Sequence, residues 1–165
     1  MLIEMNLAGV RIELPSNQPI VLLRESSGTR YLPIWIGQPE AAAIAMVLQG
    51  VSSPRPMTHD LLRDVLEALG VSVANVTITE LRDGTFYAVI RMTRDGASHE
   101  VSARPSDAIA LAVRLGCKIL VADEVLTEAS ILLPEEAGEG EETEVNEEVE
   151  RFREFLEEIE PEDFS

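Results

Sequence analysis

The 165-residue sequence predicts an α+β fold with a mixed, largely antiparallel sheet and short helices. Segments rich in Val, Ile and Tyr alternate with Gly, Pro, Asn and Asp turn signals, a pattern typical of strands and hairpins. Other segments begin near a proline or hydroxyl residue and end before a glycine, which is typical of short helices. A content of 45% apolar and 26% charged residues is ordinary for a soluble globular domain.

The first third of the chain predicts three strands, at about 2–13, 19–25 and 30–36. The polar segments 15–18 and 26–29 separate them and are short enough to be hairpin turns. We therefore expect an antiparallel meander at the N-terminus.

Two helices follow this meander. The first is predicted between Pro39 and Gly50, because proline is favoured at a helix start and glycine just past its end. The second is predicted over residues 59–69, with Thr58 as its cap and Gly70 as its terminator.

The middle of the chain predicts three more strands, at about 71–82, 85–94 and 97–103. Asp83–Gly84 and Asp95–Gly96 join them, and the Asp-Gly pair is a strong signal for a tight hairpin turn. A second meander is therefore expected.

A third helix is predicted over residues 106–115 and a final strand over 118–122. The spans Pro39–Gly50 and Pro105–Gly116 have equal length, and each is an alanine-rich helix after three predicted strands. The pattern is compatible with a duplicated three-strand-plus-helix unit. Chance is the alternative, because short helices with such ends are common.

The acidity of the chain lies mainly in its last part. Residues 1–133 carry 15 acidic and 11 basic side chains, whereas residues 134–165 carry 15 acidic and 2 basic. We predict that 1–133 is the folded domain, 134–144 a flexible acidic linker and 145–165 an acidic amphipathic helix and tail. The apolar positions of that helix recur every three or four residues: Val145, Val149, Phe152, Leu156 and Ile159. A mostly disordered acidic tail is the alternative.

Composition also limits the classes of function. No apolar run approaches the ~20 residues of a membrane span, and the N-terminus lacks signal-peptide features, so we expect a cytoplasmic protein without membrane contact. The single cysteine, Cys117, excludes an intramolecular disulfide and a multi-cysteine metal site.

Two arginine motifs are the best clue to function. Arg55 and Arg104 each precede a proline, which keeps the arginine extended, and Thr58 and Ser106 then offer hydroxyls suited to capping a helix. An arginine beside a helix N-terminus can bind phosphate through its guanidinium and the free backbone amides. The alternative is an ion pair between each arginine and the aspartate that follows it.

Carboxylates and one histidine accompany these arginines. Glu40, Asp60 and Asp107 each lie in a predicted first helical turn, and together they could hold a divalent cation, Mg²⁺ or Mn²⁺. Stabilisation of the helix dipole explains each carboxylate equally well. His59 is a candidate for proton transfer, because an imidazole titrates near neutral pH, although a packing role is the alternative.

Four segments in this order make the chain similar to the bifunctional nuclease family over roughly residues 1–135. The segments are Tyr31–Gly37 with Glu40 and Ala41, Pro54–Asp60, Asp83–Ala88 and Ala103–Ala110. The resemblance implies an α+β domain, self-association and activity on both RNA and DNA.

Two hypotheses of function follow. In the first, Asp60 and Asp107, with Glu40, hold the metal, Arg55 and Arg104 bind phosphate, and His59 shuttles a proton during phosphodiester hydrolysis. In the second, the chain is a non-enzymatic regulatory or interaction module that oligomerises, and the arginines form internal ion pairs. An open cleft favours the first hypothesis and buried ion pairs favour the second. A third, weaker hypothesis is that the acidic tail mimics nucleic acid and covers the arginines.

Overall fold

The computed structural model describes residues 1–133, so the predicted linker 134–144 and helix 145–165 lie outside the described residues. Within this described part of the chain, one sheet of eight strands is accompanied by four helices: β1 Leu2–Glu13, β2 Gln18–Glu25, β3 Arg30–Trp35, α1 Gln38–Leu48, α2 Thr58–Ala68, β4 Ser72–Arg82, β5 Thr85–Arg94, β6 Ala97–Ala103, α3 Pro105–Leu115, β7 Lys118–Ala122, α4 Asp123–Ala129 and β8 Ile131–Leu132. The predicted α+β class and the largely antiparallel sheet are confirmed.

The strand order is β6-β5-β4-β7-β1-β2-β3-β8. Strands β1 to β3 form one antiparallel meander and β4 to β6 form another. Strand β7 lies between them, antiparallel to β1 and parallel to β4. Each meander is followed by an 11-residue helix, α1 or α3, so the two parts of the chain share one order of elements.

Asp-Gly turns set the second meander, as the sequence predicts. Asp83 and Gly84 have φ values of 51° and 75°, and Asp95 and Gly96 have values of 50° and 78°. Two successive positive φ angles are typical of type I′ turns, whose twist matches that of the paired strands. The register of β4, β5 and β6 is thereby fixed locally.

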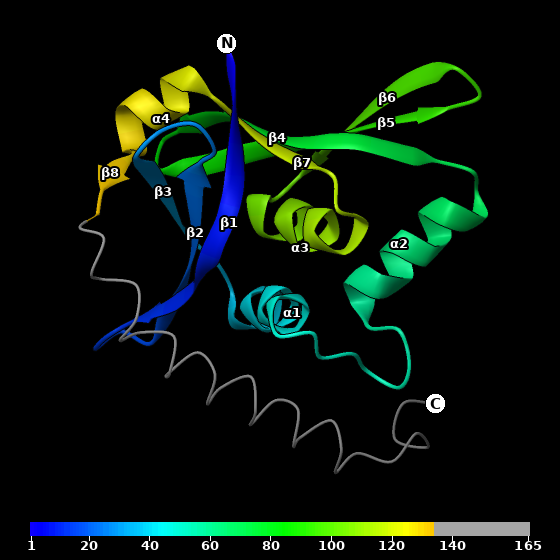
Figure 1. The fold of residues 1–165 in the computed structure, drawn as a ribbon, viewed down its shortest axis with the longest axis horizontal. Helices are drawn as coiled ribbons and strands as arrows, with labels where there is room; N and C mark the ends of the chain where they lie inside the picture. Colours follow the sequence, from blue (N-terminus) through cyan, green and yellow to red (C-terminus); the bar gives the residue numbers. More distant parts are fainter. Residues whose placement is uncertain (134–165) are drawn as a thin grey trace.

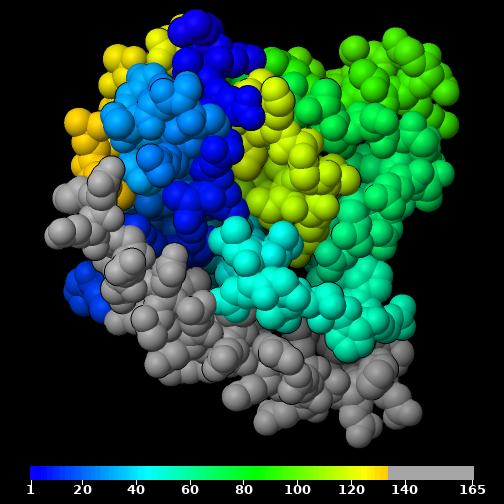
Figure 2. All heavy atoms as spheres, in the orientation of Figure 1, coloured from blue at the N-terminus to red at the C-terminus, as the bar shows by residue number. Residues whose placement is uncertain are grey.

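Three helices, α1, α2 and α3, lie on the same side of the sheet (Figure 1). Helix α3 is the central one, because Ala108–Ala112 are each at most 1% exposed and pack into the core. Its alanines allow close approach to α1, which contributes Ile44 and Met46 to the same core. The surface of α1 and the loop after it lies next to α2 (Figure 2).

Two helices begin earlier than the hydroxyl-cap pattern predicts. Met57, not Thr58, is the N-cap residue of α2, and its backbone N–H donates to the Asp60 carboxylate at 3.1 Å. Arg104 is the N-cap residue of α3, whose first residue is Pro105, and Ser106 is buried within the helix. The cap predictions are therefore wrong, because a carboxylate in one helix and a proline in the other stabilise the first turn.

The sequence pattern missed α4 and β8, which are seven and two residues long. Arg30 Nη2 donates to Asp123 Oδ1 at 3.3 Å and thereby joins the start of α4 to β3. Within residues 1–133, no helix is long and apolar enough to cross a membrane.

Candidate functional site

Three polar side chains lie near the two ends of α3. Arg104 is its N-cap residue, Asp107 lies in its first turn and Arg114 in its last. Asp107 and Arg114 are about two turns apart and therefore lie on the same side of the helix. Because the middle of α3 is buried and apolar, these three side chains make its ion pairs with neighbouring helices.

The N-terminal group joins all three helices on this side of the sheet. We call Glu40, His59, Arg104 and Asp107 the His–Asp cluster. His59 Nε2 lies 2.9 Å from Asp107 Oδ1, and Arg104 Nε and Nη2 donate to Asp107 Oδ2 at 3.0 and 2.9 Å. Arg104 Nη2 also donates to Glu40 Oε1 at 2.7 Å. The first turns of α1, α2 and α3 are thus linked through one arginine and one aspartate.

The side chains of the His–Asp cluster differ in how far they are exposed to solvent. The side chain of His59 is 11% exposed, that of Asp107 33% and that of Arg104 66%. Burial opposes ionisation of Asp107, but the hydrogen bonds from His59 and Arg104 outweigh it and hold its pKa below the ordinary value. Glu40 and then Asp107 raise the pKa of Arg104. The guanidinium is therefore the most accessible of these three groups and the imidazole the least accessible.

A second group lies near the other end of α3. Arg114 Nε donates to Asp60 Oδ1 at 2.7 Å, and its other nitrogens donate to the carbonyl oxygens of Ala110 and Ala43 at 2.8 and 3.0 Å. The Arg114 side chain is only 4% exposed. Burial raises the pKa of Asp60. The hydrogen bonds from Arg114 and Met57 lower it by more, so the pKa lies below its ordinary value.

Arg55 lies in the exposed loop between α1 and α2. Between residues 1 and 133 it forms no ion pair with a carboxylate, unlike Arg104 and Arg114. Its flanking residues Pro54 and Pro56 line a pocket. Arg55 is therefore a positive charge that an anionic ligand can approach without displacing a carboxylate of the described domain.

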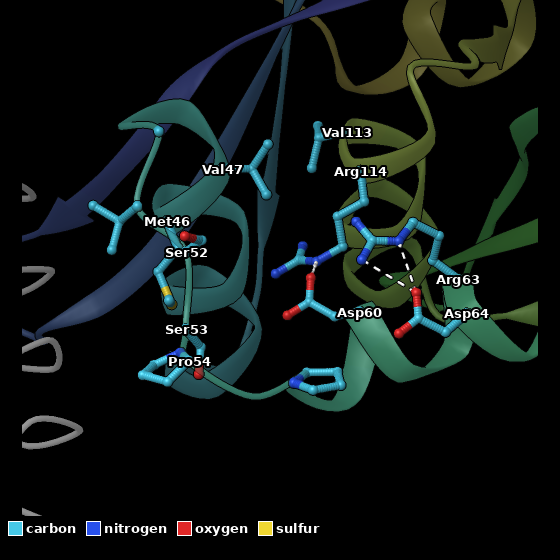
Figure 3. Close-up of a pocket in the computed structure, with 13 residues that line it drawn as sticks. Met46, Val47, Ser52, Ser53, Pro54, Asp60, Arg63, Asp64, Val113 and Arg114 are labelled. Atoms are coloured by element: carbon cyan, nitrogen blue, oxygen red, sulfur yellow. Dashed lines mark hydrogen bonds and ion pairs between the residues drawn. The ribbon is translucent and has the colours of Figure 1, made fainter.

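The pocket has a volume of about 480 Å³ and lies between α1, the following loop, α2 and α3. Figure 3 shows Val47 and Val113 on its apolar side, Ser52 and Ser53 on the loop, and Asp60 with Arg114 across from them. The pocket thus contacts the Asp60–Arg114 pair and not the four residues of the His–Asp cluster.

The carboxylates predicted to hold a metal ion already face arginines. Glu40 and Asp107 accept bonds from Arg104, and Asp60 accepts one from Arg114. In the described part of the chain, no three His, Cys, Asp or Glu side chains are arranged to hold a metal ion. This donor set does not fit a resident divalent cation, which takes six or more oxygen ligands. Metal assistance stays a prediction.

The structure therefore separates the predicted site residues into groups. Hydrogen bonds link four of them: Glu40, His59, Arg104 and Asp107. Asp60 instead pairs with Arg114, and Arg55 lies apart from both groups in the loop between α1 and α2. Sequence reasoning missed Arg114. Its signal was a single arginine seven residues after Asp107 in an otherwise apolar helix.

Comparisons with known proteins agree with the resemblance. The family model of the bifunctional nuclease domain matches residues 21–134. An uncharacterised protein of Mycobacterium tuberculosis (strain CDC 1551 / Oshkosh) is 53% identical over 162 residues, 98% of this chain and 97% of the relative.

Plant relatives are more distant. Bifunctional nuclease 1 of Oryza sativa subsp. indica is 29% identical over 103 residues, 61% of this chain and 30% of that protein. Bifunctional nuclease 2 of Oryza sativa subsp. japonica is 28% identical over 118 residues, 69% of this chain and 36% of that protein. The chain thus spans about a third of the length of these plant relatives. Since the family model covers most of its residues, the chain belongs to the bifunctional nuclease domain family.

Proposed function

We propose that this protein hydrolyses phosphodiester bonds of RNA, DNA or both at the His–Asp cluster. One observation carries the proposal: Asp107 joins the imidazole of His59 to the exposed guanidinium of Arg104 through hydrogen bonds. Proton transfer by a positioned histidine and charge neutralisation by arginine are two functions that phosphodiester cleavage requires. The plant relatives named bifunctional nucleases support the same class of reaction.

In this proposal Asp107 fixes the orientation of His59. When Nε2 of His59 carries the ring proton, its N–H donates a hydrogen bond to Asp107 Oδ1, and Nδ1 is then the acceptor nitrogen of the imidazole. Nδ1 then takes a proton from the attacking water or hydroxyl and returns it to the leaving oxygen. Asp107 stays ionised throughout, because its pKa is lowered.

Arg104 and Arg55 bind the phosphoryl oxygens in the same proposal. Arg104 has two carboxylate partners in the protein, so a phosphate at its guanidinium competes with Glu40 and Asp107. Arg55 has no such partner between residues 1 and 133 and adds charge at the neighbouring loop. The body of the domain is net negative, so local arginines rather than overall charge must attract the substrate.

The decisive experiment compares the two histidines of the chain. Fluorescent single-stranded RNA and DNA oligonucleotides are incubated with the wild type, His59→Asn and His99→Asn. His99 lies on the exposed strand β6 and is the matched control. We expect His59→Asn and Asp107→Asn each to lower the cleavage rate by about 10²–10⁴ and His99→Asn to leave it unchanged. Equal cleavage by all of these proteins would contradict the proposal.

Metal assistance is tested in the same assay. Mg²⁺ is commonly held by one or two carboxylates together with substrate phosphates, so the cation would enter with the nucleic acid. We expect EDTA to abolish cleavage and added Mg²⁺ or Mn²⁺ to restore it. Cleavage that persists in EDTA would exclude metal assistance. The reaction would then depend on proton transfer by His59 and on charge neutralisation by the arginines.

A non-enzymatic module that self-associates is the second candidate. The ion pairs favour it, because Asp60 and Asp107 are held by arginines and the four predicted groups do not line one cleft. Helix α2 with its C-cap residue also favours it, because it exposes four large apolar residues: Leu61, Leu62, Val65 and Leu69. We call these four residues the α2 stripe. The ion pairs that bind α3 to α1 and α2 would then serve only to hold the three helices together.

A further inference from the structure

We propose that the pocket between α1, α2 and α3 is a nucleobase subsite, which receives a base of a nucleic acid whose sugar-phosphate lies at the loop that carries Arg55. This inference rests on the proposed function and adds a class of ligand to it. The pocket is distinct from the His–Asp cluster, because none of the cluster's four residues lines it.

The volume and the walls of the pocket can accommodate a heteroaromatic ring. Its volume of about 480 Å³ falls in the range of small-molecule sites, ~300–1,000 Å³. Val47 and Val113 offer apolar contact, and Ser52 and Ser53 carry hydroxyl groups. An apolar wall with a few polar groups is what recognises a base by its face and edge.

The charge of the pocket excludes its use by the phosphate itself. Asp60 and Asp64 balance Arg63 and Arg114, and both arginines are already paired with these carboxylates. A phosphate inside would meet two carboxylates and find no unpaired cation on the walls. A neutral ring, in contrast, can accept bonds from hydroxyl groups and donate amine protons to carboxylate oxygens. The pocket therefore favours the uncharged part of a nucleotide.

The pocket lies against the loop that carries Arg55, which is one of the two arginines proposed to bind phosphate. Pro54 and Pro56 line it, and Arg55 lies between them in the same loop. Asp60 also lines it and follows His59 directly on α2. A base in the pocket therefore places the adjoining sugar-phosphate by the loop of residues 54–56 and the first turn of α2.

The test measures binding to the full chain by titration calorimetry with adenosine, AMP and ribose 5-phosphate. The variant Val47→Phe fills the apolar side of the pocket, and Ser52→Trp fills it from the exposed loop. The matched control is Leu48→Phe, an exposed neighbour on α1 that does not line the pocket. Thermal unfolding of each variant verifies the fold, and Ser52→Trp decides the question if Val47→Phe is unstable.

We expect adenosine and AMP to saturate one site, and both filling variants to weaken adenosine by about tenfold or more. The control Leu48→Phe should bind adenosine like the wild type. Ribose 5-phosphate should not compete with adenosine. Failure of adenosine to saturate the wild type, or folded filling variants that bind it normally, would overturn the inference. Competition by ribose 5-phosphate would also overturn it, because the pocket would then recognise phosphate.

The cleavage assay separates this inference from the proposed function. If the wild type cleaves RNA but does not bind adenosine, the subsite is wrong and the nuclease proposal stands. If the wild type binds adenosine but cleaves nothing, the subsite stands and the nuclease proposal is wrong. When both proposals hold, the filling variants raise KM and leave kcat close to that of the wild type, because they do not touch the His–Asp cluster.

Discussion

Asp60 Oδ1 lies 2.7 Å from Nε of Arg114, and this pair joins the first turn of α2 to the last turn of α3. His59, the residue before Asp60, contacts Asp107 in the first turn of α3. Two successive residues of α2 therefore contact α3 about two turns apart. The first turn of α2 thus lies across α3, where it sets the position of the His59 imidazole.

Removal of either partner of the Asp60–Arg114 pair should destabilise the domain strongly. Arg114→Met leaves the Asp60 carboxylate without its guanidinium, and Asp60→Asn leaves a buried cation without its anion. We expect each to lower the free energy of unfolding by about 3–5 kcal/mol. The double variant should lose less than the sum of the two. The measurement is urea unfolding, with exposed Arg94→Met as the control; equal losses for Arg114→Met and Arg94→Met would refute a buried pair.

Stability should fall in acid through Asp60 and Asp107. Both have pKa values lowered from the ordinary 3.8, so the unfolded chain binds their protons more tightly than the folded one. Their contribution is complete above the unfolded pKa and disappears as pH falls through the lower folded pKa. Urea unfolding between pH 2 and 7 should show this loss beginning below about pH 5.

The asparagine variants provide the control for this pH dependence. Asp60→Asn and Asp107→Asn should each be less stable than the wild type at pH 7 and should lose less stability on acidification. A wild-type profile retained in both variants would assign the acid sensitivity to other carboxylates.

Arg55 and Arg104 should each contribute one phosphate contact. We expect Arg55→Ala and Arg104→Ala to weaken binding of a single-stranded oligonucleotide. Each should also reduce the slope of log affinity against log salt by about 0.7. Fluorescence anisotropy in the His59→Asn background measures this without cleavage, and Arg94→Ala is the control. If Arg104→Ala leaves the slope unchanged but lowers the thermal midpoint, Arg104 only holds the helices together.

The α2 stripe should mediate self-association. Leu61, Val65 and Leu69 recur every four residues, so they lie along one exposed side of the helix and can pair with the same side of a second copy. Sedimentation velocity should give at least twice the chain mass of 18.1 kDa for the wild type. Leu61→Lys with Leu69→Lys should reduce it to the chain mass, and Leu132→Lys on β8 should not. A monomeric wild type would contradict this prediction.

Local signals predicted most of the fold, because they act through neighbouring residues. The Asp83–Gly84 and Asp95–Gly96 turns and the glycines after α1, α2 and α3 are all of this kind. The cap positions were wrong where Asp60 and Pro105 supplied the stabilisation in place of a hydroxyl. The short elements α4 and β8 lie below the length at which periodicity is informative.

The site could be predicted only in part for the same reason. The Arg104–Asp107 pair joins residues only three positions apart, so the sequence alone indicates it as an alternative to phosphate binding. In contrast, His59–Asp107, Asp60–Arg114 and Glu40–Arg104 join residues 48, 54 and 64 positions apart. Such contacts depend on how α1, α2 and α3 pack, which no single segment encodes. The pairing of Asp60 with Arg114 could therefore not be predicted from the sequence pattern.

The place of β7 between the two meanders has a consequence for synthesis on the ribosome. Residues 118–122 emerge after both meanders, yet among the described strands only they join the two, by pairing with β1 on one side and β4 on the other. Until they arrive, the nascent chain presents two open strand edges that can join another chain. Truncation before residue 118 should therefore give insoluble material rather than two independent halves. We therefore expect the sheet to close only after this five-residue segment has emerged.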